Sequence, residues 1–159
     1  TGLEHTILQG GPMHGQIADI LKEKGNQVHQ VGPKETVINA VNKMSSNGVG
    51  ALLVIENDRP VGIFTERDVM KRVVAEGKDP TNTSVSEVMT REMVALRPDV
   101  GVEDAMAVVT EKRCRHLPVL DNGKVVGMIS SGDLTHWATQ NREIQIKQLV
   151  DYIEGKYPG

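Results

Sequence analysis

Residues 61–69 read VGIFTERDV, and residues 126–134 read VGMISSGDL. In both stretches an apolar, β-branched run that predicts a strand ends at a hydroxyl side chain, with an aspartate three residues later. A hydroxyl and an acid at this spacing are typical of the first turn of a helix, where each side chain accepts a hydrogen bond from a backbone amide. The chain therefore contains one strand-to-helix junction twice. The two pairs are Thr65 with Asp68 and Ser130 with Asp133.

The two junctions belong to a longer internal repeat with an offset of 65 residues. Residues 33–68 align with residues 98–133 without a gap, and nine of the 36 aligned pairs are identical. Self-similarity of this kind indicates a fold built from similar structural units, each of which needs a neighbour to bury its apolar face. The repeat therefore predicts two small units that share the chain.

Each copy predicts the order strand, helix, strand, strand, helix. The helices follow from apolar residues at helical spacing, and the paired strands follow from apolar runs interrupted by Asn-Asp or Asp-Asn-Gly turn residues. The predicted elements are short extended segments at 27–31 and 93–96, helices that start at Thr36 and Gly101, hairpins at 50–64 and 116–129, and closing helices at 66–76 and 131–140.

The repeats are flanked by further predicted elements. Apolar stripes predict helices at 15–25 and 143–155, which we expect to pack onto the domain or onto a second copy rather than to lie on a membrane surface. The polar, turn-rich stretch 77–86 predicts a linker. The expected fold class is α/β (α+β). The expected boundaries are an N-terminal segment and helix at 1–25, repeats at 26–80 and 84–140, and a C-terminal helix at 141–159.

The amino-acid composition argues against several classes of protein. With 18 Lys and Arg against 21 Asp and Glu, the net charge is -3, which argues against a non-specific nucleic-acid binder. The single cysteine, Cys114, excludes an internal disulfide framework. No apolar run reaches the ~20 residues that span a bilayer, so no membrane association and a cytoplasmic location are expected.

Catalysis finds little support in the sequence. The five histidines show no metal-binding spacing such as H-E-x-x-H, and neither a nucleophile elbow nor a phosphate-binding Walker loop occurs. We therefore expect neither a catalytic residue nor a metal site, and we expect the protein not to be an enzyme.

The repeated junction has two interpretations. The first is purely structural, because a capping box satisfies the backbone amides at the start of a helix. The second is ligand binding, since amides at a helix start attract phosphate and a carboxylate there can accept the hydroxyls of a ribose. The box prefers Glu or Gln at the last position, whereas both copies have Asp, which favours a ligand role.

The combination of motifs resembles the CBS domain, named for cystathionine β-synthase. The stretches that carry the resemblance are VGALLVI, GIFTERD, SEVMT, EKRCRHLPVLDNGKVVGMIS and GDL, spread over residues 26–140. CBS domains occur in tandem pairs called Bateman modules, and this chain is similar to the stand-alone bacterial form. The resemblance implies two β-α-β-β-α repeats that bind adenosine-containing nucleotides in the cleft between them.

The resemblance also implies roles for individual residues. Asp68 with Thr65, and Asp133 with Ser130, would hold the ribose of an adenosine ligand. The adenine would lie against the first two strands of each repeat, and the phosphate would meet the opposite repeat. The implied adenine contacts are Val28, His29, Val49 and Ala51 for one site and Val94, Cys114 and His116 for the other; the implied phosphate contacts are Arg115 and His116 for the Asp68 site and Arg67 for the Asp133 site.

The residues themselves support part of this assignment. The segment KRCRH at 112–116 places cations before an apolar strand, where Arg115 could bind phosphate or could belong to a solvated basic turn. Cys114, between two arginines, is either redox-sensitive or a small apolar residue at a strand start. Thr36 corresponds to Gly101, and Gly50 corresponds to Arg115, so we expect two unequal sites.

Three functional hypotheses follow. The leading one is a regulatory, signal-transduction module that binds AMP, ADP or ATP as a homodimer and acts on a separate protein target. In the second, NAD occupies the adenosine site. The alternative is a protein-interaction scaffold with vestigial nucleotide sites. The resemblance implies that the dimer forms through the closing helices 66–76 and 131–140, with Val69, Val73, Leu134 and Trp137 at the interface.

Overall fold

The computed structural model describes residues 15–140, and the predicted helix at 143–155 lies outside them. Contacts divide the described chain into two compact units. We call them the Asp68 unit and the Asp133 unit after the aspartate of each junction. The Asp68 unit contains residues 26–95 and 116–128, and the Asp133 unit contains residues 15–25, 96–115 and 129–140.

The Asp68 unit contains a three-stranded sheet in the order β1-β2-β3. β1 (Gln30–Val31) pairs in parallel with β2 (Ala51–Glu56), which pairs antiparallel with β3 (Arg59–Thr65). The turn residues Asn57 and Asp58 have φ values of 51° and 62°, the left-handed conformation that a tight hairpin turn requires. The predicted hairpin is confirmed, whereas the first strand is shorter than the predicted 27–31.

Helix α3 (Val37–Asn47) begins and ends where the sequence indicates. The hydroxyl of Thr36 accepts a hydrogen bond from the Asn39 amide at 3.3 Å, and Gly48 at φ 62° ends the helix in the left-handed conformation. Thr36 is therefore an N-cap.

The closing helix of the first repeat differs from the prediction. A single α-helical turn, α4 (Glu66–Asp68), continues into a six-residue π-helix, η1 (Val69–Val74), in place of an α-helix over 66–76. The wider π-helical turn is usually found as a short insertion in an α-helix and is not indicated by apolar spacing.

A short helix, α5 (Val85–Val88), lies partly inside the predicted linker 77–86. The sequence does contain a pattern that indicates this helix, a serine followed three residues later by a glutamate. In the structure Ser84 and Glu87 form this capping box, and the Ser84 amide donates to Glu87 Oε2 at 2.7 Å.

One apolar cluster fills the Asp68 unit. It combines one face of α3 with residues of the sheet, η1 and α5, all at most 5% exposed. Its members are Val37, Ala40, Met44, Leu52, Val54, Phe64, Val73, Val85, Val88 and Met89. Val73 was predicted to lie at a dimer interface; this prediction is wrong, because its side chain faces the interior.

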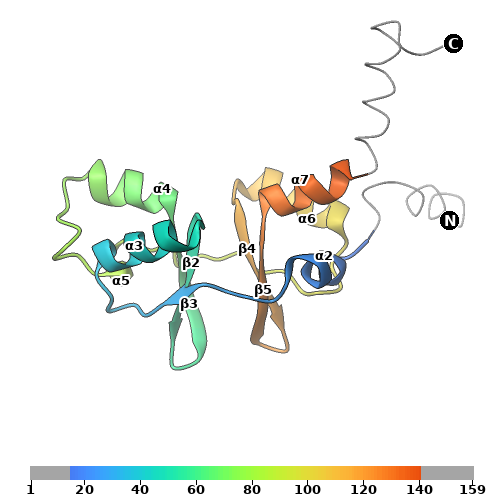
Figure 1. Ribbon diagram of the computed structural model, residues 1–159, viewed down its shortest axis with the longest axis horizontal. Coiled ribbons are helices and arrows are strands. Elements are labelled where there is room, and N and C mark those ends of the chain that lie inside the picture. The colour runs from blue at the N-terminus through green and yellow to red at the C-terminus, as the bar shows by residue number, and fades with distance from the viewer. Residues whose placement is uncertain (1–14, 141–159) are drawn as a thin grey trace, which may run out of the picture. The chain divides into compact units, whose positions relative to one another are not determined.

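The Asp133 unit packs three helices together: α2 (Ile17–Lys24), α6 (Val102–Lys112) and α7 (Ser131–Thr139) (Figure 1). The predicted N-terminal helix at 15–25 is thereby confirmed as α2. The apolar face of α2 is buried, and Leu134 of α7 is only 1% exposed. Leu134 is therefore a core residue and not the interface residue that was predicted.

The second hairpin consists of β4 (His116–Asp121) and β5 (Lys124–Ser130), with Asn122 and Gly123 at positive φ in the turn. This confirms the predicted hairpin at 116–129. The predicted extended segment at 93–96 forms no strand of two or more residues, although Leu96 is 5% exposed. An apolar run of four residues is too short to distinguish a strand from a buried loop.

The helices α5 and α2 occupy equivalent positions in the two units. An antiparallel bridge joins Ser84, before α5, to Thr36, before α3; another joins Gln16, before α2, to Gly101, before α6. The segment that precedes the first repeat thus completes the unit that contains Asp133.

Gly62 allows a close approach of two backbone segments in the Asp68 unit. Ile63 of β3 and Thr90 exchange two backbone hydrogen bonds of 2.9 Å, and a Cβ atom on Gly62 would lie 2.7 Å from Met89 Sδ and 2.9 Å from the Thr90 carbonyl oxygen. No side chain fits at this position without displacing the backbone.

We predict that Gly62→Ala lowers the free energy of unfolding by about 1–3 kcal/mol, the usual cost of overpacking. Gly32→Ala is the matched control, because no atom lies within 4 Å of its Cβ position. Urea denaturation of the two variants measures the difference, and equal stabilities would contradict the close approach.

Candidate functional site

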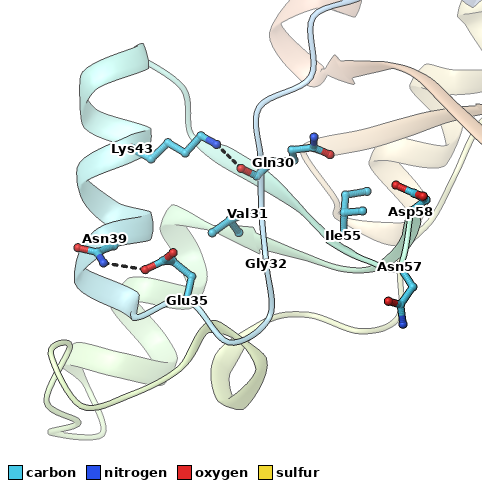
Figure 2. Close-up of a pocket in the computed structure, with 9 residues that line it drawn as sticks. All are labelled: Gln30, Val31, Gly32, Glu35, Asn39, Lys43, Ile55, Asn57 and Asp58. Carbon is cyan, nitrogen blue, oxygen red and sulfur yellow. Dashed lines mark hydrogen bonds between the residues drawn. The ribbon is translucent and has the colours of Figure 1, made fainter.

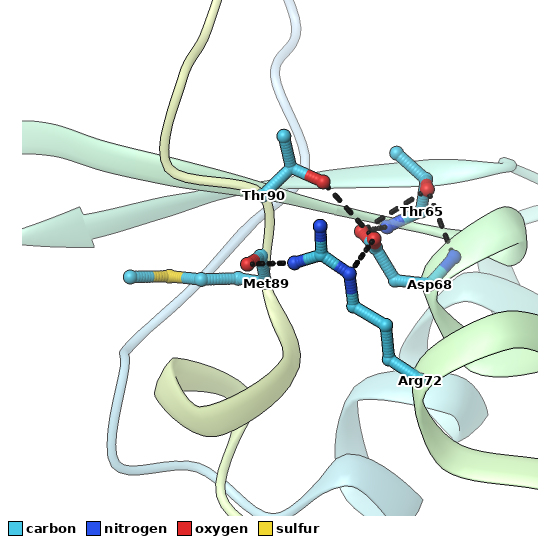
Figure 3. Close-up of polar contacts among 5 residues, drawn as sticks. All are labelled: Thr65, Asp68, Arg72, Met89 and Thr90. Carbon is cyan, nitrogen blue, oxygen red and sulfur yellow. Dashed lines mark hydrogen bonds and ion pairs between the residues drawn. The ribbon is translucent and has the colours of Figure 1, made fainter. Parts of the chain in front are cut away.

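The Thr65–Asp68 junction is a complete capping box at the end of β3 (Figure 3). The Thr65 amide donates to Asp68 Oδ2 at 3.0 Å, and the Asp68 amide donates to Thr65 Oγ1 at 3.3 Å. The Thr65 hydroxyl also donates to Asp68 Oδ2 at 3.1 Å. The sequence prediction of a helix start at this position is confirmed.

Two further residues contact the other oxygen of Asp68. The Thr90 hydroxyl donates to Oδ1 at 3.0 Å, and Arg72 Nε lies 3.7 Å from the same oxygen (Figure 3). Arg72 also donates through Nη1 to the Met89 carbonyl at 2.8 Å. The Asp68 side chain is only 5% exposed, so its carboxylate is paired inside the unit.

The Ser130–Asp133 junction has the same capping box but a different partner. The Ser130 amide donates to Asp133 Oδ2 at 2.8 Å, and the Asp133 amide donates to Ser130 Oγ at 3.1 Å. Lys24, the last residue of α2, forms an ion pair with the same Oδ2 at 2.7 Å. The Asp133 side chain is 24% exposed, about five times as much as that of Asp68.

The environment of Asp133 favours the ionised carboxylate. Burial raises the pKa of Asp133, but the hydrogen bonds and charge of Lys24, together with the hydrogen bonds from Ser130, outweigh burial and leave the pKa below its ordinary value. The carboxylate is therefore a hydrogen-bond acceptor at neutral pH.

Cys114 does not have the environment of a reactive thiol. Burial raises the pKa of the Cys114 thiol above its ordinary value, although its own backbone amide and the charge of Lys112 act in the opposite direction. A raised pKa disfavours the thiolate, which supports the interpretation of Cys114 as a small apolar residue.

The predicted phosphate contacts lie near the junctions in sequence. Arg67 and Arg115 are exposed. The Arg115 carbonyl accepts a hydrogen bond from the Ser131 amide at 2.7 Å, which places residue 115 beside the start of α7. The Nε2 atom of His116 lies 3.5 Å from the Cβ position of Gly50, and the carbonyl of Gly50 accepts from the Glu66 amide at 3.0 Å. His116 therefore lies close to the start of α4.

The predicted adenine contacts divide between the units. In the Asp68 unit, the His29 carbonyl accepts from the Leu53 amide at 3.0 Å, which holds the segment before β1 against β2. Ala51 is buried at the start of β2. The other members are half-buried: Val28, His29, Val49, Val94, Cys114 and His116.

A cavity of about 530 Å³ lies elsewhere, between α3, β1 and the tip of the first hairpin (Figure 2). Four of the residues that line it form two hydrogen-bonded pairs. Lys43 donates to the Gln30 carbonyl, and Asn39 donates to Glu35 Oε1 at 2.6 Å. None of the predicted site residues lines it.

Sequence reasoning missed three residues that contact the motif aspartates: Lys24, Arg72 and Thr90. Arg72 could have been found, because it stands four residues after Asp68 on the same helical segment. Thr90 and Lys24 carry no local signal, because they come from segments 22 and 109 residues away.

Residues 15–140 contain neither a membrane-spanning helix nor a cluster of metal-binding side chains. No helix there is long and apolar enough to cross a bilayer. No group of three or more histidine, cysteine, aspartate or glutamate side chains in that range is arranged to hold a metal ion.

Comparison with known proteins identifies the repeat. The family model of the CBS domain matches residues 17–75 and again residues 85–139. The chain is 38% identical over 108 residues to the CBS domain-containing protein YhcV of Bacillus subtilis, a match that covers 68% of this chain and 76% of YhcV.

Solved structures give the same result. The crystal structure of the CBS domain NE2398 has a TM-score of 0.77 and 43% identity, covering 79% of this chain and 98% of that one. A CBS-domain protein of Burkholderia ambifaria, for which a role in signal transduction has been suggested, has a TM-score of 0.74 and 40% identity, covering 77% and 92%. The hexameric CBS-CP12 protein of bloom-forming cyanobacteria has a TM-score of 0.72 and 30% identity, covering 80% and 70%. The chain belongs to the CBS-domain family and has the α+β fold of a pair of CBS repeats.

Proposed function

We propose that this protein is a regulatory module, not an enzyme, that binds an adenosine-containing nucleotide through the aspartate of its repeated junction. The observation that carries the proposal is the Asp133 carboxylate, which is ionised and partly exposed at the start of α7 in a CBS repeat. A carboxylate of this kind accepts hydrogen bonds from a pair of ribose hydroxyls. Signal transduction, suggested for the Burkholderia relative, agrees with this role.

The phosphate groups of the ligand would be bound by cations near the junctions. Arg115 is exposed next to the start of α7, and a guanidinium offers two parallel donors to a phosphate. Arg67 and His116 are the further candidates carried over from the family. AMP, ADP and ATP share the adenosine that this site would recognise, and NAD contains it as well.

The second candidate function is an interaction scaffold without a ligand. It is favoured by the Asp68 junction, where the carboxylate is buried and paired within its own unit. In both cases the regulated target would be a separate protein, in a cytoplasmic setting.

AMP should raise the melting temperature of the wild-type protein. At a hundredfold excess over Kd, a ligand that binds only the folded state adds about 2.7 kcal/mol, which corresponds to roughly 5–10 °C for a chain of this size. ADP, ATP and NAD should also raise it, whereas CMP should have a smaller effect. Differential scanning fluorimetry checks this.

The Asp99→Asn variant is the matched control for carboxylate loss, because Asp99 is exposed and pairs with Arg97 away from both junctions. It should keep the full AMP shift. If millimolar AMP, ADP, ATP and NAD all leave the wild-type melting temperature unchanged, the scaffold is the correct function.

We further propose that the protein forms a homodimer through η1. Met70 and Val74 are 59% and 70% exposed, and they are the exposed large apolar side chains of the part of the chain that the structure describes. They lie four residues apart, so they share one face of the helical segment. Burying such a face against a second copy removes apolar surface from water.

Light scattering should therefore give twice the mass of one chain, and the double substitution Met70→Glu, Val74→Glu should shift the protein to the monomer. Lys71→Glu is the control, because it adds a carboxylate at an exposed position of the same segment. A wild-type mass equal to one chain at all concentrations would contradict the dimer.

A further inference from the structure

We propose that the two motif aspartates have different roles: Asp68 is a structural residue that fastens the closing helix of its repeat, and Asp133 alone binds the nucleoside. This inference rests on the proposed function and makes it more specific. It predicts one ligand per chain, whereas the sequence repeat predicts two.

The first argument is the number of acceptor positions that remain on each carboxylate. A carboxylate oxygen accepts about two hydrogen bonds. In Asp68, Oδ2 accepts from the amide and the hydroxyl of Thr65, while Oδ1 accepts from Thr90 and faces Arg72. Three hydrogen bonds thus reach the carboxylate, and the Arg72 guanidinium lies 3.7 Å from the oxygen that accepts only one of them. A pair of ribose hydroxyls would have to displace at least one of these partners.

The second argument is that Thr90 cannot easily move away. Its backbone exchanges two hydrogen bonds of 2.9 Å with Ile63, and its carbonyl lies against Gly62, where no side chain separates the two segments. Arg72 is held as well, because its Nη1 donates to the Met89 carbonyl at 2.8 Å. A ligand that reached Asp68 would have to break hydrogen bonds to a buried charged group. Breaking these costs more free energy than breaking hydrogen bonds between neutral groups.

Asp133, in the second junction, is not held by partners equivalent to Arg72 and Thr90. The position that corresponds to Arg72 in the repeat is Trp137, whose ring packs against Gly15 and carries no charge. The ion pair of Asp133 comes instead from Lys24 and uses Oδ2. No hydrogen bond reaches Asp133 Oδ1 from any residue between 15 and 140, and the side chain is 24% exposed.

This arrangement suits a ligand with two neighbouring hydroxyl groups. Asp133 Oδ1 offers acceptor positions for them, and the carboxylate remains ionised because Lys24 and Ser130 lower its pKa. The site should therefore distinguish AMP from 2′-deoxy-AMP, which has lost one of the two donors.

Isothermal titration calorimetry with AMP tests the assignment in the full chain. Wild-type protein should bind one AMP per chain, and Asp133→Asn should weaken binding by about tenfold or more, the effect of removing the charge from a hydrogen bond. The same loss should appear for wild-type protein titrated with 2′-deoxy-AMP. Asp68→Asn should change the affinity by no more than about twofold, as expected for a site that does not touch the ligand.

Thermal melts without ligand test the structural role. Asp68→Asn should lower the melting temperature by roughly 5–10 °C, because the amide places an NH2 donor where one carboxylate oxygen now accepts hydrogen bonds from Thr65 or Thr90. Thr90→Val removes one partner of Asp68 and keeps the shape of the side chain, so it should also lower the melting temperature and leave the stoichiometry at one. Thr110→Val is the matched control, since its exposed hydroxyl bonds only to a carbonyl in its own helix.

The outcomes separate the inference from the proposed function. Two AMP molecules per chain, or loss of AMP binding in Asp68→Asn and Thr90→Val but not in Asp133→Asn, would overturn the division of roles and leave nucleotide binding intact. No binding of AMP, ADP, ATP or NAD to wild-type protein would overturn the proposed function together with the site at Asp133.

Discussion

The pair of backbone hydrogen bonds between Ile63 and Thr90 is the contact on which the Asp68 unit depends. It brings the segment after α5 onto β3, and it requires glycine at position 62, because any side chain would push the two backbones apart. Once Thr90 is fixed, its hydroxyl reaches Asp68, and the Met89 carbonyl becomes available to Arg72. One close approach of two backbones thus determines the surroundings of a carboxylate that the sequence alone would assign to a ligand.

In the two units, different parts of the chain supply the short helix that packs beside the repeat. Each needs a short capped helix beside its repeat, which α5 supplies to one unit and α2 to the other. In each unit a residue from that region reaches the motif aspartate, Thr90 in the first case and Lys24 in the second. The two contacts have different effects. The Thr90 hydroxyl donates to a carboxylate that is only 5% exposed, whereas the Lys24 ammonium keeps a partly exposed carboxylate in its ionised form.

The features that could be predicted from the sequence are those encoded by neighbouring residues. Both hairpins, the N-cap at Thr36 and both capping boxes depend on residues that are a few positions apart, so local patterns are sufficient. The length of β1 and the π-helical turn after Asp68 depend on packing across the unit, which apolar spacing does not report. The partners of the aspartates were missed because Thr90 and Lys24 come from distant segments. Local rules therefore identified the junctions and predicted two unequal sites, but they could not show that the Asp68 carboxylate is buried whereas that of Asp133 is partly exposed.

The position of α2 has a consequence for how the chain folds during synthesis. The apolar cluster of the Asp68 unit is drawn from the continuous stretch between Val37 and Met89, so the ribosome synthesises all of it before α7. Helix α2 leaves the ribosome before that stretch, yet its partner α7 begins only at Ser131. Contacts between such distant segments form slowly, because the loop between them must first close. The apolar face of α2 therefore has no contact with α7 until residues 131–139 have been synthesised, and the Asp133 unit is completed after the apolar cluster of the Asp68 unit.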